Sequence, residues 1–400
     1  MKYIVLVPDG VADYPISELG GKTPLEVART TNMDFLAQNG FTGLVQTIPP
    51  KMKPGSDIGN LALLGYDPKK YYFGRAPLEA ANLDIRLADD EVAFRCNLVT
   101  VEAGRMIDYS AGHIPTKEAS ELISALSKEI RQSNSKFYVG KSYRHLLVLK
   151  TMRKNDFLKI QCTAPHDILD KEIKEFLPRG KESEVLLSLM EQSKNILNNH
   201  PENQVRIDLK ENPANMIWLW GQGARPQLPS FMEKFGVQGS VISAVDLVNG
   251  IGKLIGLQVI SVPGATGYYD TNFKGKAEYA LNSLADKDFV FVHVEATDEA
   301  GHNGDYKMKI QCIERFDRDV VGTVLDYFNR YDDVRILVCP DHVTPVEKRT
   351  HTAEAVPFVM FGKGIQKDEA ENYSEATGKK QGLKFKSGEA MMEHFMRRYL

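Results

Sequence analysis

Carboxylate and imidazole side chains follow an apolar, strand-like run near the middle of the C-terminal half of the chain. The run Val290–Val294 is β-branched and aromatic, and the charged turn after it contains Asp298 and His302, four residues apart. If the chain turns helically there, both side chains lie on one face, where a carboxylate and an imidazole can share a metal ion. The alternative is an ordinary capping acid at a helix start.

Two further apolar runs end in residues of the same types. Residues 335–339 lead into the adjacent pair Asp341 and His342, and His351 follows in the next turn. Because neighbouring side chains at a strand end diverge, such a pair can serve two different sites. Residues 3–7 lead to Asp9, which stands before a glycine; taken alone, Asp-Gly is also typical of a simple turn.

A serine stands at a fourth such position. Ser56 follows a Pro-Gly turn and opens an apolar segment that predicts a helix. The amide groups and positive dipole end of a helix N-terminus favour an alkoxide or a phosphate. The simpler interpretation is that Ser56 is an N-cap, with Asp57 as the acid of the first turn.

Together these positions offer three carboxylates, three imidazoles and one hydroxyl. Six such ligands exceed the needs of one four-coordinate ion and suit two divalent ions. Two ions roughly 3.5–4 Å apart form a clamp for phosphoryl transfer, and a metal-bound serine hydroxyl can act as the nucleophile. The predicted metal ligands are Asp9, Asp298, His302, Asp341, His342 and His351, with Ser56 as the nucleophile.

The elements that must position these residues have the pattern of an α/β protein with a doubly wound, mostly parallel sheet, in which chemistry lies at the carboxyl ends of the strands. Residues 1–115 and 233–400 are predicted to form this domain. Its expected strands are residues 3–7, 41–48, 92–101, 239–243, 258–262, 290–294, 335–339 and 356–361, and its expected helices are residues 31–39, 244–257, 272–284 and 307–330.

Residues 116–232 combine amphipathic, charged helical segments with short strand-like runs, a pattern that predicts an inserted α+β domain. A second domain is expected because 400 residues exceed the usual size of a single core. The Gly-x-Gly at residues 221–223 predicts a returning loop, because Pro226 and Pro229 prevent the helix of a dinucleotide site. The expected helices are residues 117–133 and 183–199, and the expected strands are residues 137–139, 146–149, 158–160 and 216–220.

The composition excludes several classes of protein. Hydrophobic residues make up 42% and charged residues 26%, and the net charge is −3, which argues against a nucleic-acid or membrane surface. The four cysteines are scattered, which indicates reduced thiols in a cytoplasmic protein. The apolar run at the N-terminus is too short for a signal peptide or a membrane span.

The motifs of the chain resemble those of a known group of enzymes, the alkaline phosphatase superfamily. More narrowly, they resemble its archaeal-type cofactor-independent phosphoglycerate mutases. The resemblance is densest in residues 1–115 and 239–360. Its motifs are Pro8-Asp9-Gly10, Pro54-Gly55-Ser56-Asp57, Thr297-Asp298-x-x-Gly301-His302, Pro340-Asp341-His342, Thr350-His351-Thr352, Lys22-Thr23-Pro24, Thr31-Asn32-Met33-Asp34, Leu64-Gly65-Tyr66-Asp67-Pro68 and Gly74-Arg75-Ala76-Pro77-Leu78-Glu79-Ala80.

The resemblance implies an alkaline-phosphatase-like fold, two divalent metal ions and no 2,3-bisphosphoglycerate. Mn²⁺ and Zn²⁺ both suit such ligands, with Mg²⁺ as a third candidate. One ion would be held by Asp9, Ser56, Asp341 and His342, and the other by Asp298, His302 and His351. Phosphate would pass from phosphoglycerate to the serine and return to the other hydroxyl of glycerate, under an inserted domain that closes and excludes water.

The same family binds its substrate partly through arginines, a lysine and a histidine. The candidates in this chain, chosen by residue type and position, are Arg75, Arg95, His166, Arg225 and Lys253. Each has a surface or packing role as its alternative.

The leading expectation is therefore an isomerase, a phosphoglycerate mutase acting on a small phosphorylated substrate. The second is a phosphatase or another phosphotransferase on the same metal core, such as the homoserine kinases proposed among bacterial relatives, although the chain contains no Gly-x-x-x-x-Gly-Lys-Ser/Thr motif. The third is a non-catalytic metal-binding relative. The sequence leaves the oligomeric state open.

Overall fold

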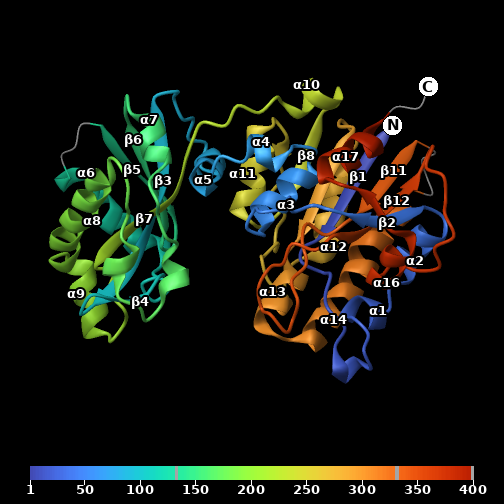
Figure 1. The fold of residues 1–400 in the computed structure, drawn as a ribbon, viewed down its shortest axis with the longest axis horizontal. Helices are drawn as coiled ribbons and strands as arrows, with labels where there is room; N and C mark the ends of the chain where they lie inside the picture. Colours follow the sequence, from blue (N-terminus) through green and yellow to red (C-terminus); the bar gives the residue numbers. More distant parts are fainter. Residues whose placement is uncertain (131–133, 329–332, 398–400) are drawn as a thin grey trace. The chain divides into compact units, whose positions relative to one another are not determined.

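The computed structural model describes residues 1–130, 134–328 and 333–397. Within them the chain divides into two compact units (Figure 1). The first unit combines residues 1–72 with residues 228–400, and the second consists of residues 73–227. The second unit is thus inserted into the sequence of the first.

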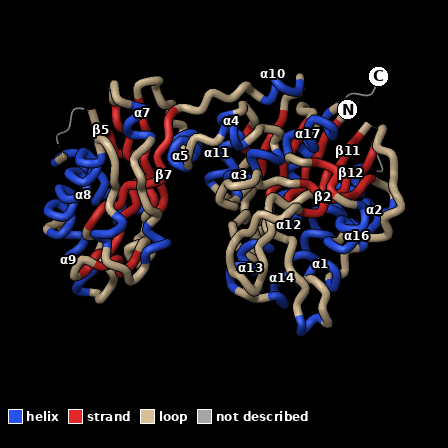
Figure 2. The backbone as a smooth tube through the Cα atoms, in the orientation of Figure 1, coloured by secondary structure: helices blue, strands red, loops and turns tan. Residues whose placement is uncertain are grey.

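The first unit is built on an eight-stranded sheet with the strand order β13-β2-β12-β11-β1-β10-β8-β9. Strands β2, β11 and β12 of this sheet are labelled in Figure 2, where strands are red. All neighbouring strands are parallel except at β12, which is antiparallel to β11 and to β2. This arrangement confirms the predicted α/β class with a mostly parallel sheet. The strands are β1 (Lys2–Pro8), β2 (Phe41–Val45), β8 (Gly239–Ile242), β9 (Gln258–Val259), β10 (Phe289–Val294), β11 (Val334–Val338), β12 (Val356–Gly362) and β13 (Leu383–Phe385).

Alternate residues of the central strands point to opposite faces of this sheet, and helices cover both. Ile4 and Leu6 of β1 face a core shared with α1, α2, α12, α14 and α15, whereas Tyr3 packs against Phe395 of α17 on the other side. The helices are α1 (Pro24–Val27), α2 (Thr31–Gln38), α3 (Ser56–Leu63), α4 (Pro68–Tyr71), α10 (Phe231–Phe235), α11 (Asp246–Leu254), α12 (Phe273–Ser283), α13 (Ala296–Asn303), α14 (Tyr306–Arg315), α15 (Gly322–Phe328), α16 (Glu375–Gln381) and α17 (Gly388–Met396), with a short 3-10 turn η1 (Ser17–Leu19).

Strands β11, β1 and β10 lie side by side and run parallel, so their carboxyl ends meet at one edge. Asp9 follows β1, Asp341 is the third residue after β11, and Asp298 lies in the first turn of α13 after β10. Topology therefore brings three acidic residues, distant in sequence, to one place.

The second unit contains a five-stranded antiparallel sheet with the order β4-β3-β6-β5, and β7 pairs with β3 on its other side. Helices α6 and α8 share a buried apolar core with one face of this sheet, and α5 packs on the other face. The strands are β3 (Glu91–Glu102), β4 (Arg105–Asp108), β5 (Ser135–Lys141), β6 (Arg144–Lys150) and β7 (Met216–Ala224), and the helices are α5 (Arg75–Asn82), α6 (Thr116–Glu129), α7 (Lys154–Leu158), α8 (Ser183–Asn198) and α9 (Pro201–Asp208), with 3-10 turns η2 (Pro165–Ile168) and η3 (Ile173–Phe176).

The boundary between the units differs from the expected one at its N-terminal crossing. The prediction placed residues 1–115 with 233–400 and residues 116–232 in the insertion, whereas the second unit begins at Phe73 and ends at Gln227. The reason is that β3 pairs with β6 and β7 along almost its whole length. A sequence that reads as one more strand of the doubly wound sheet is thus the central strand of the inserted unit.

Two local predictions are also wrong. Residues 158–160 do not form a strand, because Phe157 and Ile160 are buried three residues apart at the end of α7 and the turn after it. The expected loop at residues 221–224 continues β7 and pairs with β3. The expected helix 307–330 is confirmed as continuous helix through Phe328, with a π-helical segment, η4 (Phe316–Val321), between α14 and α15.

Parts of two predicted helices, residues 131–133 and 329–330, lie outside the described residues. Within the part of the chain that the structure describes, no helix is both long enough and apolar enough to cross a bilayer. The four cysteines are free thiols, of which Cys96, Cys312 and Cys339 are buried.

Candidate active site

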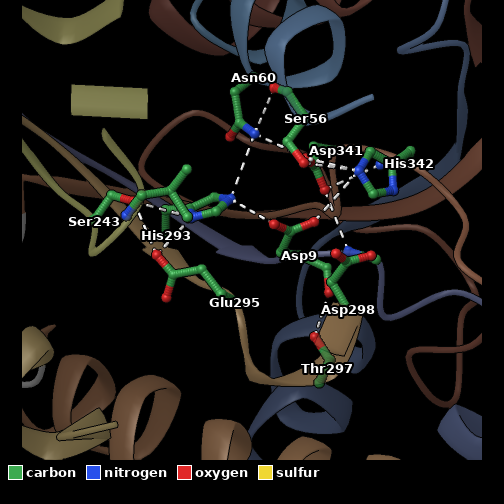
Figure 3. A network of polar contacts seen from close by, with 12 residues as sticks. Asp9, Ser56, Asn60, Ser243, His293, Glu295, Thr297, Asp298, Asp341 and His342 are labelled. Atoms are coloured by element: carbon green, nitrogen blue, oxygen red, sulfur yellow. Dashed lines mark hydrogen bonds and ion pairs between the residues drawn. The ribbon is translucent and has the colours of Figure 1, made fainter. Parts of the chain in front are cut away.

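Ser56 is the first residue of α3 and is partly buried. The residue before it, Gly55, holds the N-cap position, and no side chain caps this helix. The interpretation of Ser56 as an N-cap is therefore wrong. Its hydroxyl lies 3.1 Å from Nε2 of His342 (Figure 3).

His342 Nε2 is the point on which a first group of oxygen atoms converges. It lies 3.5 Å from Oδ1 of Asp9 and 3.4 Å from Oδ2 of Asp341, in addition to the Ser56 hydroxyl. The three ionisable side chains of this group are buried. The structure thus brings together four residues that the sequence resemblance assigned to one ion, from the ends of β1 and β11 and the start of α3.

Asp298, His302 and His351 form a second group. His302 Nε2 lies 3.1 Å from Oδ2 of Asp298 and 2.9 Å from Nε2 of His351, which in turn is 3.6 Å from Oδ1 of Asp298. Asp298 and His302 share one face of α13, as the four-residue spacing predicts. His302 and His351 keep about a third and a fifth of their side-chain surface exposed.

The two groups adjoin each other. Asp298, His342 and His351 have potential ligand atoms within 4.8 Å of one another. The ring centres of His342 and His351 are 4.1 Å apart. The hydroxyl of Thr344 donates a hydrogen bond to Asp298 and lies 3.1 Å from Nδ1 of His342. One side chain therefore orients a residue of each group.

Asp9 and Asp298 have opposite pKa shifts. Burial raises the pKa of Asp9 well above its usual value, and the negative charges of Asp341 and Asp298 raise it further. Burial also acts to raise the pKa of Asp298, but hydrogen bonds from His302 and His351 outweigh it and hold that pKa well below the usual range. The hydrogen bond to Asp298 raises the pKa of His302 to about 9.

These side chains fit two divalent cations. Oδ1 of Asp9 is buried and has no hydrogen-bond partner among the described residues, although it faces His342. A buried acceptor without a donor is costly, and a cation would satisfy it and offset the mutual repulsion of the carboxylates. Carboxylate and imidazole groups are the ligands that Mn²⁺ and Zn²⁺ accept.

Sequence reasoning missed two residues that support the clusters. The amide of Asn60 donates to Oδ2 of Asp341 at 2.8 Å and to the carbonyl of Ser56 at 2.9 Å. Its place one helical turn after Ser56 is a signal that the sequence contained. His293 lies 3.1 Å from Asp9, and it is the only polar residue of β10.

Among the predicted substrate-binding residues, Arg75, Arg95 and His166 lie together in the second unit. The guanidinium of Arg95 is 4.3 Å from the ring centre of Trp220 and pairs with Glu79 at 2.9 Å. Arg75 approaches the same ring at 6.0 Å, and His166 packs edge-on against it at 5.3 Å.

Arg144, which the sequence did not single out, adds to this group of cations. Burial lowers the pKa of Arg95, and the positive charges of Arg75 and Arg144 act in the same direction. The Nε atoms of Arg95 and Arg144 are buried without a partner among the described residues. These features indicate a place where an anion would be stabilised.

The other two predicted substrate residues have different surroundings. Arg225 is half exposed and pairs with Asp89 at 3.6 Å, within the second unit. Lys253 lies in the last turn of α11, within the first unit. The five candidates therefore belong to two different units.

Residues 37–203 match the model of a protein family described as 2,3-bisphosphoglycerate-independent phosphoglycerate mutase. A protein of that name from Methanothrix thermoacetophila is 49% identical over 383 residues, which cover 96% of each chain. A protein from Geobacter sulfurreducens, named a probable enzyme of this type, is 47% identical over 403 residues, with both chains covered completely.

Two solved structures are similar to this chain over almost its whole length. A protein from Pyrococcus horikoshii superposes with a TM-score of 0.82 and 29% identity, covering 100% of this chain and 99% of its own. A cofactor-independent phosphoglycerate mutase from Thermoplasma acidophilum superposes with a TM-score of 0.68 and 29% identity, covering 99% of each chain. The similarity extends over both units.

Proposed function

Because the chain belongs to the 2,3-bisphosphoglycerate-independent phosphoglycerate mutases, a family of isomerases, we propose that it interconverts 3-phosphoglycerate and 2-phosphoglycerate through a phosphoserine at Ser56. The observation that carries the proposal is the position of the Ser56 hydroxyl, 3.1 Å from a buried imidazole that also faces Asp9 and Asp341. A hydroxyl so placed lies beside an imidazole and close to the carboxylates that would hold an activating metal ion.

Two divalent cations would be held by the two groups of side chains. Asp9, Ser56, Asp341 and His342 would hold one, and Asp298, His302 and His351 the other. When bound, the ions supply positive charge that lowers the pKa of the serine hydroxyl and neutralises phosphate oxygens. Mn²⁺ and Zn²⁺ are the candidates, and no 2,3-bisphosphoglycerate is needed because Ser56 carries the phosphoryl group.

The chain's own part in the reaction is a double displacement at phosphorus. Oγ of Ser56 forms a bond to phosphorus while the bond from phosphorus to the 3-oxygen breaks, and the glycerate 3-oxygen gains the proton that the serine loses. The 2-hydroxyl of glycerate then bonds to phosphorus, the bond to Oγ breaks, and the serine regains a proton. Water attacking at the second step would release phosphate, so the site must exclude it.

The cationic group of the second unit supports a role in binding the substrate. Arg75, Arg95 and Arg144 with His166 would hold an anionic group, either the carboxylate or the phosphate of phosphoglycerate. Loss of one such charge-assisted contact costs roughly 1.5–3 kcal/mol, which corresponds to about a 10- to 100-fold increase in KM.

The direct test is a product assay with 3-phosphoglycerate and Mn²⁺, without added 2,3-bisphosphoglycerate. The proposal predicts 2-phosphoglycerate as the product and a loss of at least about 10³-fold in turnover for Ser56→Ala. Ser17→Ala, at an exposed serine of the first unit, is the matched control and should leave turnover unchanged.

The products also separate this proposal from its alternatives. Release of glycerate and phosphate without isomerisation would identify a phosphatase, and conversion of ATP to ADP with homoserine would identify a kinase. Unchanged turnover in Ser56→Ala would refute the role of the serine.

A further inference from the structure

Asp9 is held at its backbone by the end of β10 and the first turn of α13. Its amide donates to the carbonyl of Val294 at 3.0 Å, and its carbonyl accepts a hydrogen bond from the hydroxyl of Thr297. These contacts fix where the residue lies but leave its carboxyl group free to rotate. Something else must decide which oxygen faces Ser56 and His342.

His293 contacts one of the two carboxylate oxygens. Its Nε2 lies 3.1 Å from Oδ2 of Asp9, whereas Oδ1 has no hydrogen-bond partner among the described residues and faces His342 (Figure 3). Asn60 also approaches Nε2, at 3.4 Å, but shorter contacts to Asp341 and the Ser56 carbonyl use both hydrogens of its amide. The Nε2 hydrogen of His293 is thus available to Asp9.

The other side of the imidazole is fixed by Glu295 and its partners. Nδ1 of His293 lies 3.1 Å from Oε1 of Glu295, which also accepts hydrogen bonds from the hydroxyl of Ser243 and the amide of Ala244, each at 2.9 Å. Lys276 pairs with Oε2 of the same carboxylate at 2.6 Å. His293 and Lys276 are fully buried, and Glu295 almost so. A ring held in this way cannot rotate without breaking an ion-paired network.

We propose that His293 is a positioning residue that holds Oδ2 of Asp9 and thereby presents Oδ1 to the metal ion beside Ser56. Glu295 and Lys276 fix the orientation of its ring. A carboxylate ligand supported by a hydrogen bond at its second oxygen binds with one oxygen only, in a defined direction. This inference rests on the proposed metal role of Asp9.

The grouping of ligand atoms offers a competing role. Asp9, His293 and Asp341 have ligand atoms within 4.8 Å of one another, so His293 could itself be a ligand. The contact of Nε2 with the Asp9 oxygen that points away from His342 favours positioning over ligation. The two roles give different outcomes when His293 is replaced.

Two replacements separate the contacts that His293 makes. In His293→Asn the amide reaches the place of Nδ1, and so keeps the contact with Glu295 but loses the one with Asp9. In His293→Gln the amide reaches the place of Nε2 and can still donate to Asp9. His145→Asn is the matched control, because His145 is also a buried imidazole but lies in the second unit.

The measurement is titration of the metal-free full-length protein with Mn²⁺ by calorimetry, with the melting temperature of each metal-free variant as a check on folding. We expect two sites in the wild type. His293→Asn should weaken one of them about 10- to 100-fold and leave the other unchanged. His293→Gln should remain within a few-fold of the wild type, and His145→Asn should equal it.

Three results would overturn the inference. Wild-type affinity in His293→Asn would show that Asp9 needs no such support. Equal weakening in His293→Asn and His293→Gln would show that the contact with Asp9 does not matter. Complete loss of one site in both variants would make His293 a ligand. If the wild type bound no Mn²⁺, the proposed function itself would fail.

Discussion

Glu375 is a buried carboxyl group outside the candidate site. Its oxygens accept hydrogen bonds from the amide of Asp13 at 3.0 Å and from the hydroxyl of Thr23 at 2.7 Å, and among the described residues no lysine, arginine or histidine donates to it. Burial raises the pKa of Glu375 to about 7, although these hydrogen bonds oppose the shift. The folded protein therefore keeps this proton at pH values where an unfolded chain has lost it.

This shift predicts that part of the stability depends on pH. Below pH 4.5 both the folded and the unfolded chain bind the proton, and the contribution of Glu375 to the free energy of unfolding is complete. This contribution is lost as the pH rises from about 4.5 to about 7, and it amounts to about 3 kcal/mol at most. Glu375→Gln removes the charge, so its melting temperature should gain on the wild type between pH 5 and pH 8. Glu371→Gln, at an exposed position, is the control. Parallel pH profiles for the wild type and Glu375→Gln would contradict the prediction.

At the scale of elements, Ser56 is positioned by the close approach of α3 to the end of β11. A Cβ atom at Gly59 would collide with the backbone carbonyl of Asp341 and lie 2.8 Å from its Cβ. Only glycine allows this distance. The glycine thus fixes the separation between the proposed nucleophile and the Asp341–His342 pair.

Gly59→Ala should therefore force α3 away from the strand end. We expect a destabilisation of about 1–3 kcal/mol, as for other overpacked sites, and a disproportionate loss of turnover because Ser56 moves with the helix. Thermal melts and the mutase assay measure the two effects. Gly267→Ala, where an added Cβ meets nothing within 4 Å, should change neither; a Gly59→Ala enzyme with normal turnover would contradict the account.

The elements that carry the candidate ligands could be predicted from the sequence because their signals are local. The apolar runs ending at Asp9, Asp298 and Asp341 are strands β1, β10 and β11, followed directly by their polar residues. Parallel pairing of these strands then places their carboxyl ends together. The convergence of the proposed metal ligands Asp9, Asp298 and Asp341 follows from these two facts.

Other features depend on tertiary contacts that no local pattern reveals. Residues 92–101 predict a strand equally well for either sheet, and only their pairing with β6 and β7 assigns them to the inserted unit. His293 appears as one polar residue in an apolar strand until Asp9 and Glu295 are placed beside it. The pairing of Arg225 with Asp89 and the place of Lys253 in the first unit likewise follow from the fold alone.

At the scale of the whole molecule, the predicted family and enzyme class are confirmed by relatives that match nearly the full length of the chain. All proposed metal ligands and the nucleophile lie in the first unit, whereas the cationic group around Trp220 lies in the second. Each unit has its own buried core.

The second unit should therefore fold without the first. Residues 73–227 have a length typical of one domain, and Gly74 lies against the backbone of Gln222, so the two ends of the segment lie close together. We expect the isolated segment to show strand and helix signals by circular dichroism and one cooperative thermal transition. A broad, non-cooperative melt would show that its core depends on the first unit.

The most direct test of the central claim is to look for the phosphoryl group on the protein. The full-length enzyme with Mn²⁺ is mixed with 3-phosphoglycerate, quenched in acid within one turnover and analysed by peptide mass spectrometry. The account predicts a phosphate on Ser56 that disappears on further turnover and is absent from Ser56→Ala. Isomerisation without phosphate on Ser56, or with phosphate on another residue, would contradict it.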